Sequence, residues 1–313
     1  GLHLVSGLAR AAVALVTQSL HDLAAFGLVP DVAAAAQCLR VAPTLAEAVR
    51  EASYVQESGP ELQSVKAQVF AEMDAAAPAD AVLASSTSAI VASRFTQSLE
   101  GRARCLVAHP VNPPHLVPVV EVCGAPWTDA AVKQRAIAVL KSVGQVPIDV
   151  KREIDGFVLN RLQVALLTEA FRLVQDGVVS PQDLDHTIAD GLGLRWAFMG
   201  PFETIELNAP GGMADYCRRY VDWFRRYMAD APPADVWDDA PWLRAAAAWG
   251  RAPSGAEIAG KSRWRDKRLA ALVAHKRGQP PHSEKGSSPH QGAPDERFQA
   301  PPQEGRDHLR RHR

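Results

Sequence analysis

Apolar residues recur at helical spacing at the start of the chain. Over Leu2–Gln37 this pattern predicts one or two amphipathic helices, broken near Gly27 and Pro30. Thr44 and Glu47 then have the spacing of a capping box. In this motif the Thr44 hydroxyl accepts the backbone N–H of Glu47, and the Glu47 carboxylate accepts the backbone N–H of Thr44. A short helix is therefore expected to begin after Thr44.

Short apolar runs, separated by helical patterns, predict buried strands in the next part of the chain. The runs cover residues 54–56, 81–84, 105–108, 117–122 and 146–150. Helical spacing over Pro60–Ala75 and Ala130–Ser142 lies between some of them. Alternation of strands and helices is typical of an α/β domain with a Rossmann-like parallel sheet. We assign this domain to residues 1–152.

The pattern changes after Gly156. The segment Phe157–Asp176 is apolar on almost every side, which predicts a long buried helix. Ser180 and Pro181 are a good cap and first residue for the next helix. No later segment has a convincing strand pattern. Residues 153–275 are therefore expected to form an all-helical C-terminal domain.

The tail, residues 276–313, is rich in Pro, Gln, His and charged residues, and it has a single aromatic residue, Phe298. Such a composition cannot bury enough apolar surface to fold, so we expect disorder. Its basic end, residues 310–313, is interpreted as a solvated tail in preference to an anion-binding patch.

Composition excludes several classes of protein. The net charge of −1 does not favour a nucleic-acid partner. No uninterrupted apolar run reaches the roughly 20 residues of a membrane span. The four cysteines (Cys38, Cys105, Cys123 and Cys217) are too widely spaced for a zinc site or a disulfide scaffold, which favours reduced thiols in a cytoplasmic protein.

Polar residues stand where the predicted strands end. Ser88 follows the strand at residues 81–84, His109 ends the strand at 105–108, and Glu121 lies near the end of the strand at 117–122. Polar groups at the carboxyl ends of neighbouring strands face the crevice where open α/β sheets bind ligands. Asn160 lies in the apolar helix that follows, where its amide needs partners.

Some of these residues also suit a purely structural role. Ser88 equally suits a helix cap, and Glu121 suits an acid on a surface loop. His109 and His115 suggest a metal pair, but prolines intervene and a third ligand is missing, so no metal site is expected.

Several motifs occur together in order. They are H-P-V-N-P at residues 109–113, V-E-V at 120–122 and G-F-V-L-N-R at 156–161, preceded by Ser88. In this order the chain resembles the 3-hydroxyacyl-CoA dehydrogenase family from about Thr44 to Lys276. The second proline, Pro114, and the segment from Arg195 to Pro201 narrow the resemblance to the branch that includes lambda-crystallin.

The resemblance implies a role for each polar residue. His109 would be the general base that removes the proton of the substrate hydroxyl, since imidazole exchanges its proton near neutral pH. Glu121 would hold the other ring nitrogen. Ser88 and Asn160 would hydrogen-bond the oxygen that becomes a carbonyl.

The resemblance also implies a cofactor side of the cleft. The matching family positions, here Glu61 and Lys66, line that side, and NAD is the implied cofactor. From sequence alone, Glu61 also suits compensation of a helix dipole, and Lys66 suits a solvated position.

The glycine-rich turn of a dinucleotide site, G-x-G-x-x-G, is missing. The nearest string, Gly191-Leu192-Gly193, lacks the third glycine and lies in the helical half. We therefore expect the chain to lack the first strand, first helix and second strand of its NAD-binding domain. This would leave apolar sheet edges exposed and would weaken NAD binding.

Three functions follow from the resemblance. The first is NAD-dependent oxidation of the 3-hydroxyl of a small hydroxy acid, with L-gulonate to 3-dehydro-L-gulonate as the preferred reaction. The second is oxidation of a 3-hydroxyacyl-CoA, and the third is a non-catalytic, crystallin-like structural role. A homodimer is implied, paired through the helical domain.

Overall fold

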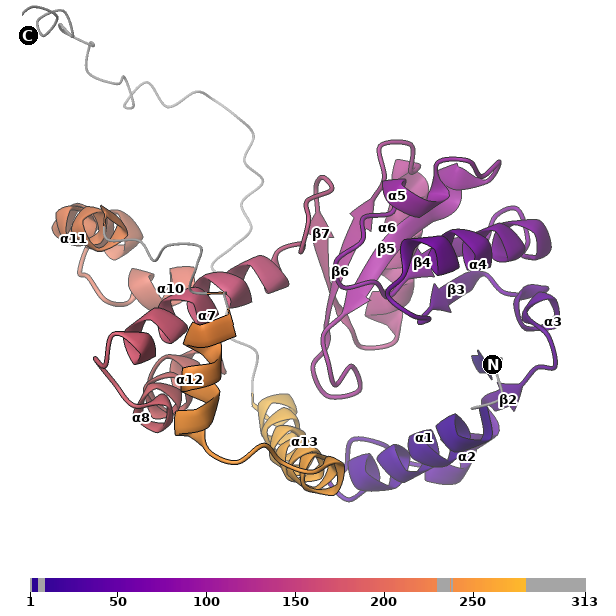
Figure 1. The fold of residues 1–313 in the computed structure, drawn as a ribbon. Coiled ribbons are helices and arrows are strands. Elements are labelled where there is room, and N and C mark those ends of the chain that lie inside the picture. The colour runs from indigo at the N-terminus through magenta and orange to yellow at the C-terminus, as the bar shows by residue number, and fades with distance from the viewer. Residues whose placement is uncertain (1, 5–8, 230–236, 238, 280–313) are drawn as a thin grey trace, which may run out of the picture. The chain divides into compact units, whose positions relative to one another are not determined.

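The computed structural model describes residues 2–4, 9–229, 237 and 239–279. The chain divides into two compact units, Gly1–Ala274 and His275–Arg313. All the strands lie in the first unit (Figure 1). Of the second unit, residues 275–279 are described, and they include the end of α13 (Gly255–Arg277), so the predicted tail begins as helix. Residues 280–313, where disorder is predicted, lie outside the described residues.

A five-stranded sheet forms the centre of the first unit. Its strands, in spatial order, are β3 (Tyr54–Glu57), β4 (Val82–Ser85), β5 (Cys105–Pro110), β6 (Val119–Gly124) and β7 (Val146–Val150). Every neighbouring pair is parallel except β5 and β6. The prediction of a parallel-dominated α/β sheet is confirmed. The β5–β6 pair is antiparallel because the connection is too short for the crossover that parallel strands require.

Both faces of the sheet are apolar because helices cover both. Cys105, Val107 and Cys123 pack on the side of α4 (Gln63–Ala76) and α5 (Ser93–Thr96). Strand residues between them, such as Leu106 and Val122, pack on the other side against α6 (Ala130–Ser142). Successive side chains of a strand point to opposite faces, so strands buried on both sides read as continuous apolar runs.

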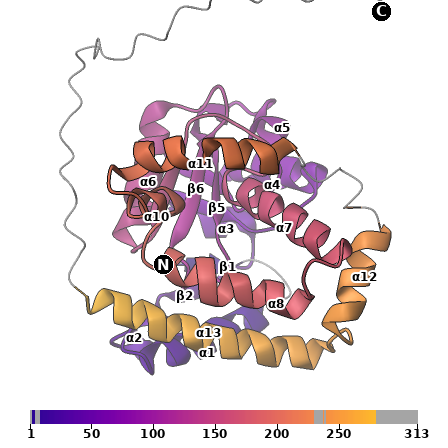
Figure 2. The same cartoon turned by 90° about the vertical axis from the view of Figure 1, so that its left-hand side faces the viewer.

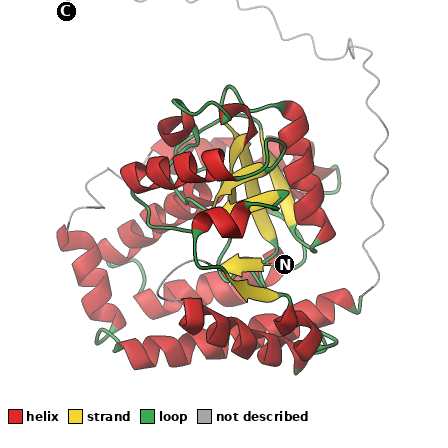
Figure 3. Cartoon of the chain, turned by 90° about the vertical axis from the view of Figure 1, so that its right-hand side faces the viewer, coloured by secondary structure: helices red, strands yellow, loops and turns green. Residues whose placement is uncertain are grey.

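A second, two-stranded sheet joins β1 (Leu2–Leu4) and β2 (Leu39–Val41) in parallel (Figure 3). Helices α1 (Ala9–Ala24) and α2 (Val32–Gln37) lie between these strands in sequence. The helix prediction is confirmed for α1 and α2, with a break at Gly27, whose φ of 69° suits glycine. It is wrong for Leu2–Leu4, whose backbone pairs with β2, a distant partner that local spacing does not reveal.

Thr44 caps α3 (Leu45–Val49), as predicted. Its hydroxyl accepts from the backbone N–H of Glu47 at 3.2 Å. The Glu47 side chain lies 3.3 Å from the same hydroxyl and accepts its hydrogen, so only half of the expected box forms.

After β7 the described residues form helices alone (Figure 2). They are α7 (Leu159–Gln175), α8 (Pro181–His186), the π-helix η2 (Thr187–Leu192), α9 (Gly193–Trp196), α10 (Pro201–Glu206), α11 (Gly212–Ala229), α12 (Asp239–Trp249) and α13. Ser180 caps α8 and Pro181 is its first residue, as predicted. The domain boundary at residues 152 and 153 lies between β7 and α7 and stays a prediction.

The long helix predicted after Gly156 is present, but the prediction that it is buried is wrong. No residue of α7 is buried, and Leu162 is 64% exposed. Helices α8 and α12 pack against part of its surface. Its remaining apolar faces have no cover among the described residues. An apolar pattern on all sides of a helix therefore does not show which residues pack against it.

We predict that Phe70→Ala lowers the free energy of unfolding by about 3–5 kcal/mol. Phe70 is fully buried on α4, and its ring lies edge-on to Phe95 with centroids 4.8 Å apart. Urea denaturation measures the change. The control, Phe202→Ala, removes a side chain that is 71% exposed and should stay within about 0.5 kcal/mol of the parent. Equal losses for both variants would contradict the core described above.

Candidate active site

His109 and Glu121 face each other across the antiparallel pair of strands. They are direct partners in the β5–β6 register. His109 Nδ1 lies 2.9 Å from Glu121 Oε2, and both side chains are buried. A buried charge needs partners, and each of these groups supplies one for the other. The sequence predicted both residues at the ends of strands, which is confirmed for His109 in β5. It is wrong for Glu121, the third residue of β6, which lies opposite His109 because the two strands are antiparallel.

The second oxygen of Glu121 caps helix α7. Oε1 accepts the backbone N–H groups of Val158 at 2.8 Å and Leu159 at 2.9 Å. The first N–H groups of a helix have no partner within the helix and carry its positive dipole end, so a carboxylate is well placed there. With Oε1 accepting two donors, Oε2 takes the Nδ1–H of His109. The other ring nitrogen, Nε2, is left to accept a proton.

An unusual turn delivers α7 to this carboxylate. Gly156 has φ 75° and Phe157 has φ 47°, so both lie in the left-handed region, which costs energy for a bulky residue. Phe157 is fully buried, and its ring centroid lies 5.8 Å from that of His109. Burial of the phenyl ring beside the imidazole holds the strained residue in place.

Asn160, in the first turn of α7, reaches the turn after β4. Its Nδ2 donates to the backbone oxygen of Ser88 at 2.8 Å. Ser88 itself is exposed, on a turn that follows the carboxyl end of β4. Ser88 and Asn160 therefore lie together, as expected, but their contact is through the serine backbone, which leaves the Ser88 hydroxyl outside this hydrogen bond.

Glu61 holds the same turn from its other side. Its Oε1 accepts the N–H of Ser88 at 3.2 Å and of Ala89 at 3.1 Å, and it also accepts from the Thr87 hydroxyl. Burial alone would raise the pKa of Glu61. The hydrogen bonds from Thr87 and Ala89, with the charge of Lys66, outweigh burial and lower that pKa below its ordinary value. Glu61 is thus a carboxylate at neutral pH.

Lys66 is buried instead of facing the cleft. Its Nζ lies 3.1 and 3.2 Å from the two carboxylate oxygens of Glu57, and 3.6 Å from Glu61 Oε2. The sequence reasoning did not single out Glu57 or Thr87. Glu57 carries the same signal that identified Glu121, an acid at the end of an apolar strand, and that signal could have found it.

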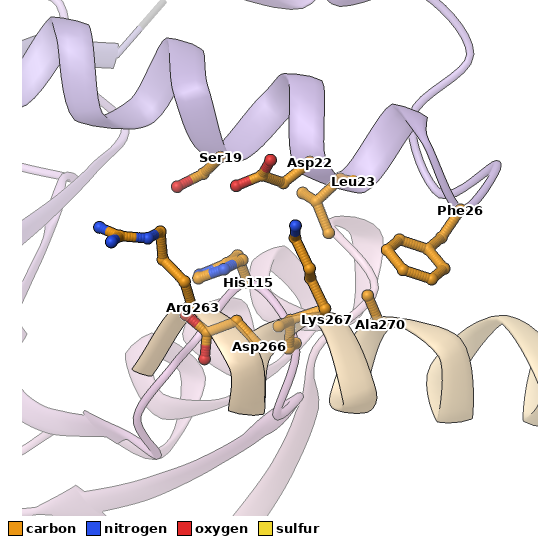
Figure 4. A pocket seen from close by; sticks show the side chains of 10 residues that line it. Ser19, Asp22, Leu23, Phe26, His115, Arg263, Asp266, Lys267 and Ala270 are labelled. Atoms are coloured by element: carbon orange, nitrogen blue, oxygen red, sulfur yellow. The ribbon is translucent and has the colours of Figure 1, made fainter. Parts of the chain in front are cut away.

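A small cavity lies elsewhere in this unit, between α1 and α13 (Figure 4). It has a volume of about 40 Å³, room for only a few water molecules. His115, from the β5–β6 connection, lines it together with Asp22, Arg263 and Lys267. None of the predicted catalytic residues lines it, so the cavity is separate from the His109 site.

Metal-ligating side chains are not gathered in the described part of the chain, where no group of three or more His, Cys, Asp or Glu could hold an ion. Burial raises the pKa of the Cys105 thiol to about 12 and that of Cys123 to about 11, so neither is an activated nucleophile. Among the described helices, none is both long and apolar enough to cross a membrane.

Comparison with known families decides the class of this site. Residues 5–154 match the family model of the 3-hydroxyacyl-CoA dehydrogenase NAD-binding domain, and residues 156–257 match that of its C-terminal domain. The chain belongs to the 3-hydroxyacyl-CoA dehydrogenase family. It is therefore an NAD-dependent hydroxy acid dehydrogenase, and the fold expected from that family is confirmed.

Individual relatives agree with this family. Rabbit (Oryctolagus cuniculus) lambda-crystallin is 41% identical over 239 residues, covering 76% of this chain and 75% of the relative. The L-carnitine dehydrogenase of Pseudomonas aeruginosa is 40% identical over 208 residues, covering 66% of this chain and 61% of the enzyme. A solved structure of a 5-formyl-3-hydroxy-2-methylpyridine 4-carboxylic acid 5-dehydrogenase, described as an NAD⁺-dependent dismutase, superposes with a TM-score of 0.76. It is 26% identical and covers 89% of this chain and 90% of its own.

The residues present fit one end of the 3-hydroxyacyl-CoA dehydrogenase cofactor. The half-exposed carboxylate of Glu61 and the hydroxyls of Ser58 and Ser86 follow the ends of β3 and β4, and these donors and acceptors suit the polar groups of NAD. The sequence has no G-x-G-x-x-G turn for the pyrophosphate.

We predict that Glu121→Gln lowers the free energy of unfolding by about 1–3 kcal/mol and disturbs the His109 tautomer. A glutamine has one acceptor oxygen, which cannot serve both the α7 backbone and Nδ1–H. Urea denaturation and ¹⁵N NMR of the imidazole measure the two effects.

The matched control is Glu153→Gln. Glu153 accepts one backbone N–H, from Ser93 at 2.8 Å, and an amide oxygen can still do so. This variant should unfold within about 0.5 kcal/mol of the parent. If Glu121→Gln were as stable as the parent, the capping role assigned to Glu121 would be wrong.

Proposed function

We propose that this chain oxidises the 3-hydroxyl of a small hydroxy acid, with L-gulonate to 3-dehydro-L-gulonate as the reaction. The observation that carries the proposal is the buried His109–Glu121 pair, which leaves Nε2 of the imidazole available as a base. The choice of L-gulonate rests on the resemblance to the branch that includes lambda-crystallin, whose rabbit member is 41% identical to this chain.

The residues act on one substrate carbon. His109 Nε2 takes the hydroxyl proton while the hydrogen on the same carbon leaves as hydride, and the C–O bond becomes a carbonyl. NAD, when bound, supplies the hydride acceptor. Glu121 stabilises the imidazolium that forms, because its carboxylate already faces Nδ1 at 2.9 Å. Ser88 and Asn160 hydrogen-bond the substrate oxygen, and Glu61 with Lys66 supports the cofactor side.

A second reaction is favoured by one comparison. The L-carnitine dehydrogenase relative is 40% identical, and its name indicates a small hydroxy acid that also carries a cation. Carnitine and a 3-hydroxyacyl-CoA are therefore the competing substrates in the test below. We also propose a cytoplasmic location, which the free cysteines Cys38, Cys105, Cys123 and Cys217 support.

We predict NAD-dependent turnover of L-gulonate that falls by about 10²–10⁴-fold in His109→Gln. NADH absorbance is followed with L-gulonate, L-carnitine and 3-hydroxybutyryl-CoA in parallel. The highest kcat/KM identifies the substrate class. His115→Gln, which changes a histidine of the β5–β6 connection that lines the separate small cavity, is the control and should keep its activity. Absence of turnover with all three substrates would contradict the proposed reaction and favour the structural, crystallin-like role.

We further propose that the chain forms a homodimer through its helical region. Exposed large apolar side chains concentrate there, on α7 and on α11. On α11, Trp223 is 55% exposed, and Tyr216, Tyr220 and Phe224 form a row of neighbouring rings along the helix. Contiguous aromatic and aliphatic surface of this kind marks protein interfaces.

We predict that Leu162→Arg converts a dimer into a monomer, because a charge placed in an apolar interface loses its hydration without gaining a partner. Light scattering after gel filtration measures the mass. The control is Leu15→Arg, a similarly exposed leucine on α1, which should leave the mass unchanged. A parent protein with monomer mass at micromolar concentration would overturn the proposal.

A further inference from the structure

A continuous chain of polar contacts runs from the end of β3 to the turn that carries Ser88. It begins at Glu57, which is 6% exposed. Glu57 Oε2 accepts the hydroxyl of Ser85 at 2.5 Å, and Oε1 accepts the backbone N–H of Gly59. Both oxygens also contact Lys66 Nζ, at 3.1 and 3.2 Å. The carboxylate is thus held from three sides, by a strand, a loop and helix α4.

Lys66 links this carboxylate to a second one. Its Nζ lies 3.6 Å from Glu61 Oε2, farther than from Glu57. A buried ammonium needs a close counter-charge, since loss of hydration costs several kcal/mol. Glu57 supplies that close contact. Glu61 therefore need not turn toward the lysine, and its Oε1 stays on the backbone of Ser88 and Ala89.

The turn is therefore held by one side chain on each side of Ser88. Glu61 accepts the N–H of Ser88, and Asn160 donates to its carbonyl. Ser85 adds a link, because its hydroxyl donates to Glu57 and accepts the N–H of Thr87 at 3.2 Å. A shift of Glu61 toward Lys66 would release the N–H groups of Ser88 and Ala89, and the Ser88 hydroxyl would move with its backbone.

We propose that Glu57 is a positioning residue for the dehydrogenase reaction, acting through Lys66 to keep Glu61 on the turn that carries Ser88. The proposal rests on the function proposed above, in which Ser88 contacts the substrate oxygen. It also revises the expected role of Lys66, which is to orient Glu61 and not to touch the cofactor.

A second buried ion pair in the same domain gives a matched control. Asp74, also on α4, lies 2.8 Å from Arg104, and both side chains are largely buried. Asp74 accepts the backbone N–H of Gly101 at 3.0 Å, so it holds a different loop. Either substitution removes one buried carboxylate, Asp74 from α4 or Glu57 from β3. Of the two, Glu57 is the one connected to Ser88 through Lys66 and Glu61.

The test compares Glu57→Gln with Asp74→Asn by amide hydrogen exchange, read residue by residue with NMR. In Glu57→Gln, the amides of Ser88 and Ala89 should exchange about 10- to 100-fold faster, the loss expected when a hydrogen bond to a charged group is released. Gly101 should be unaffected. In Asp74→Asn the pattern should reverse, with Gly101 faster and the Ser88 turn unchanged.

Enzyme kinetics give a second readout. Glu57→Gln should lower kcat about tenfold with little change in KM for the hydroxy acid, since a displaced Ser88 weakens contacts made mainly in the transition state. Equal acceleration of Ser88, Ala89 and Gly101 in Glu57→Gln would overturn the proposal, because it would show a general loss of stability. Failure of the parent enzyme to turn over any hydroxy acid would sink the proposed function but leave the exchange result readable.

A double variant covers the case in which Glu57→Gln does not fold. Glu57→Gln with Lys66→Met removes both charges and leaves no unpaired ion in the core. Without Lys66, the pKa of Glu61 should rise from its lowered value, because one of the influences that lower it is lost. The pH at which the Ala89 amide signal titrates should then move upward. An unchanged titration would contradict the link through Lys66.

Discussion

The Glu121 carboxylate joins the two halves of the described structure. One of its oxygens faces His109 within the sheet, and the other caps the first turn of α7. A single buried carboxylate thus contacts His109, the proposed base, and caps the first helix of the helical region. Because α7 carries Asn160, the same contact also sets the position of the amide on the opposite side of the Ser88 turn. Catalytic geometry and the placement of the first turn of α7 therefore depend on one group.

The Ser88 turn is the second place where separate parts of the chain meet. It receives Glu61 from the segment before α4 and Asn160 from α7. Each contact uses the backbone of the turn, which has two polar groups per residue that must be paired. These hydrogen bonds hold the turn without using the Ser88 hydroxyl, which agrees with the substrate contact proposed for it.

The sequence predicted well those features that depend on local pattern. The bounds of α6 and β7 match the observed residues, and Thr44 and Ser180 cap their helices as expected. It placed His109 near the carboxyl end of its strand, as observed, but Glu121 is the third residue of β6 and not at the end of a strand, because β6 runs antiparallel to β5 and extends to Gly124. The motifs of the family then supplied roles that periodicity alone does not give.

The sequence did not predict the features that depend on residues far away in the chain. The Leu2–Leu4 segment is a strand because β2 pairs with it, although its local pattern reads as part of a helix. Lys66 was expected to be solvated or to face the cofactor, and its burial depends on Glu57, which is nine positions away and on another element. The burial of α7 was inferred from its apolar composition. Composition does not show whether another part of the same chain or a second molecule packs against the helix.

The exposed faces of α7 bear on the site itself. Asn160 lies in the first turn of this helix, and Glu121 fixes that end, while the apolar side chains farther along, such as Leu162 and Leu166, are open. Helices α8 and α12 cover part of α7, and its remaining apolar faces have no cover among the described residues. A second copy packed on these faces would bury large aliphatic side chains and favour a single position of the helix. In the homodimer proposed above, association of two chains would therefore fix the helix that carries Asn160 without adding any residue to the site.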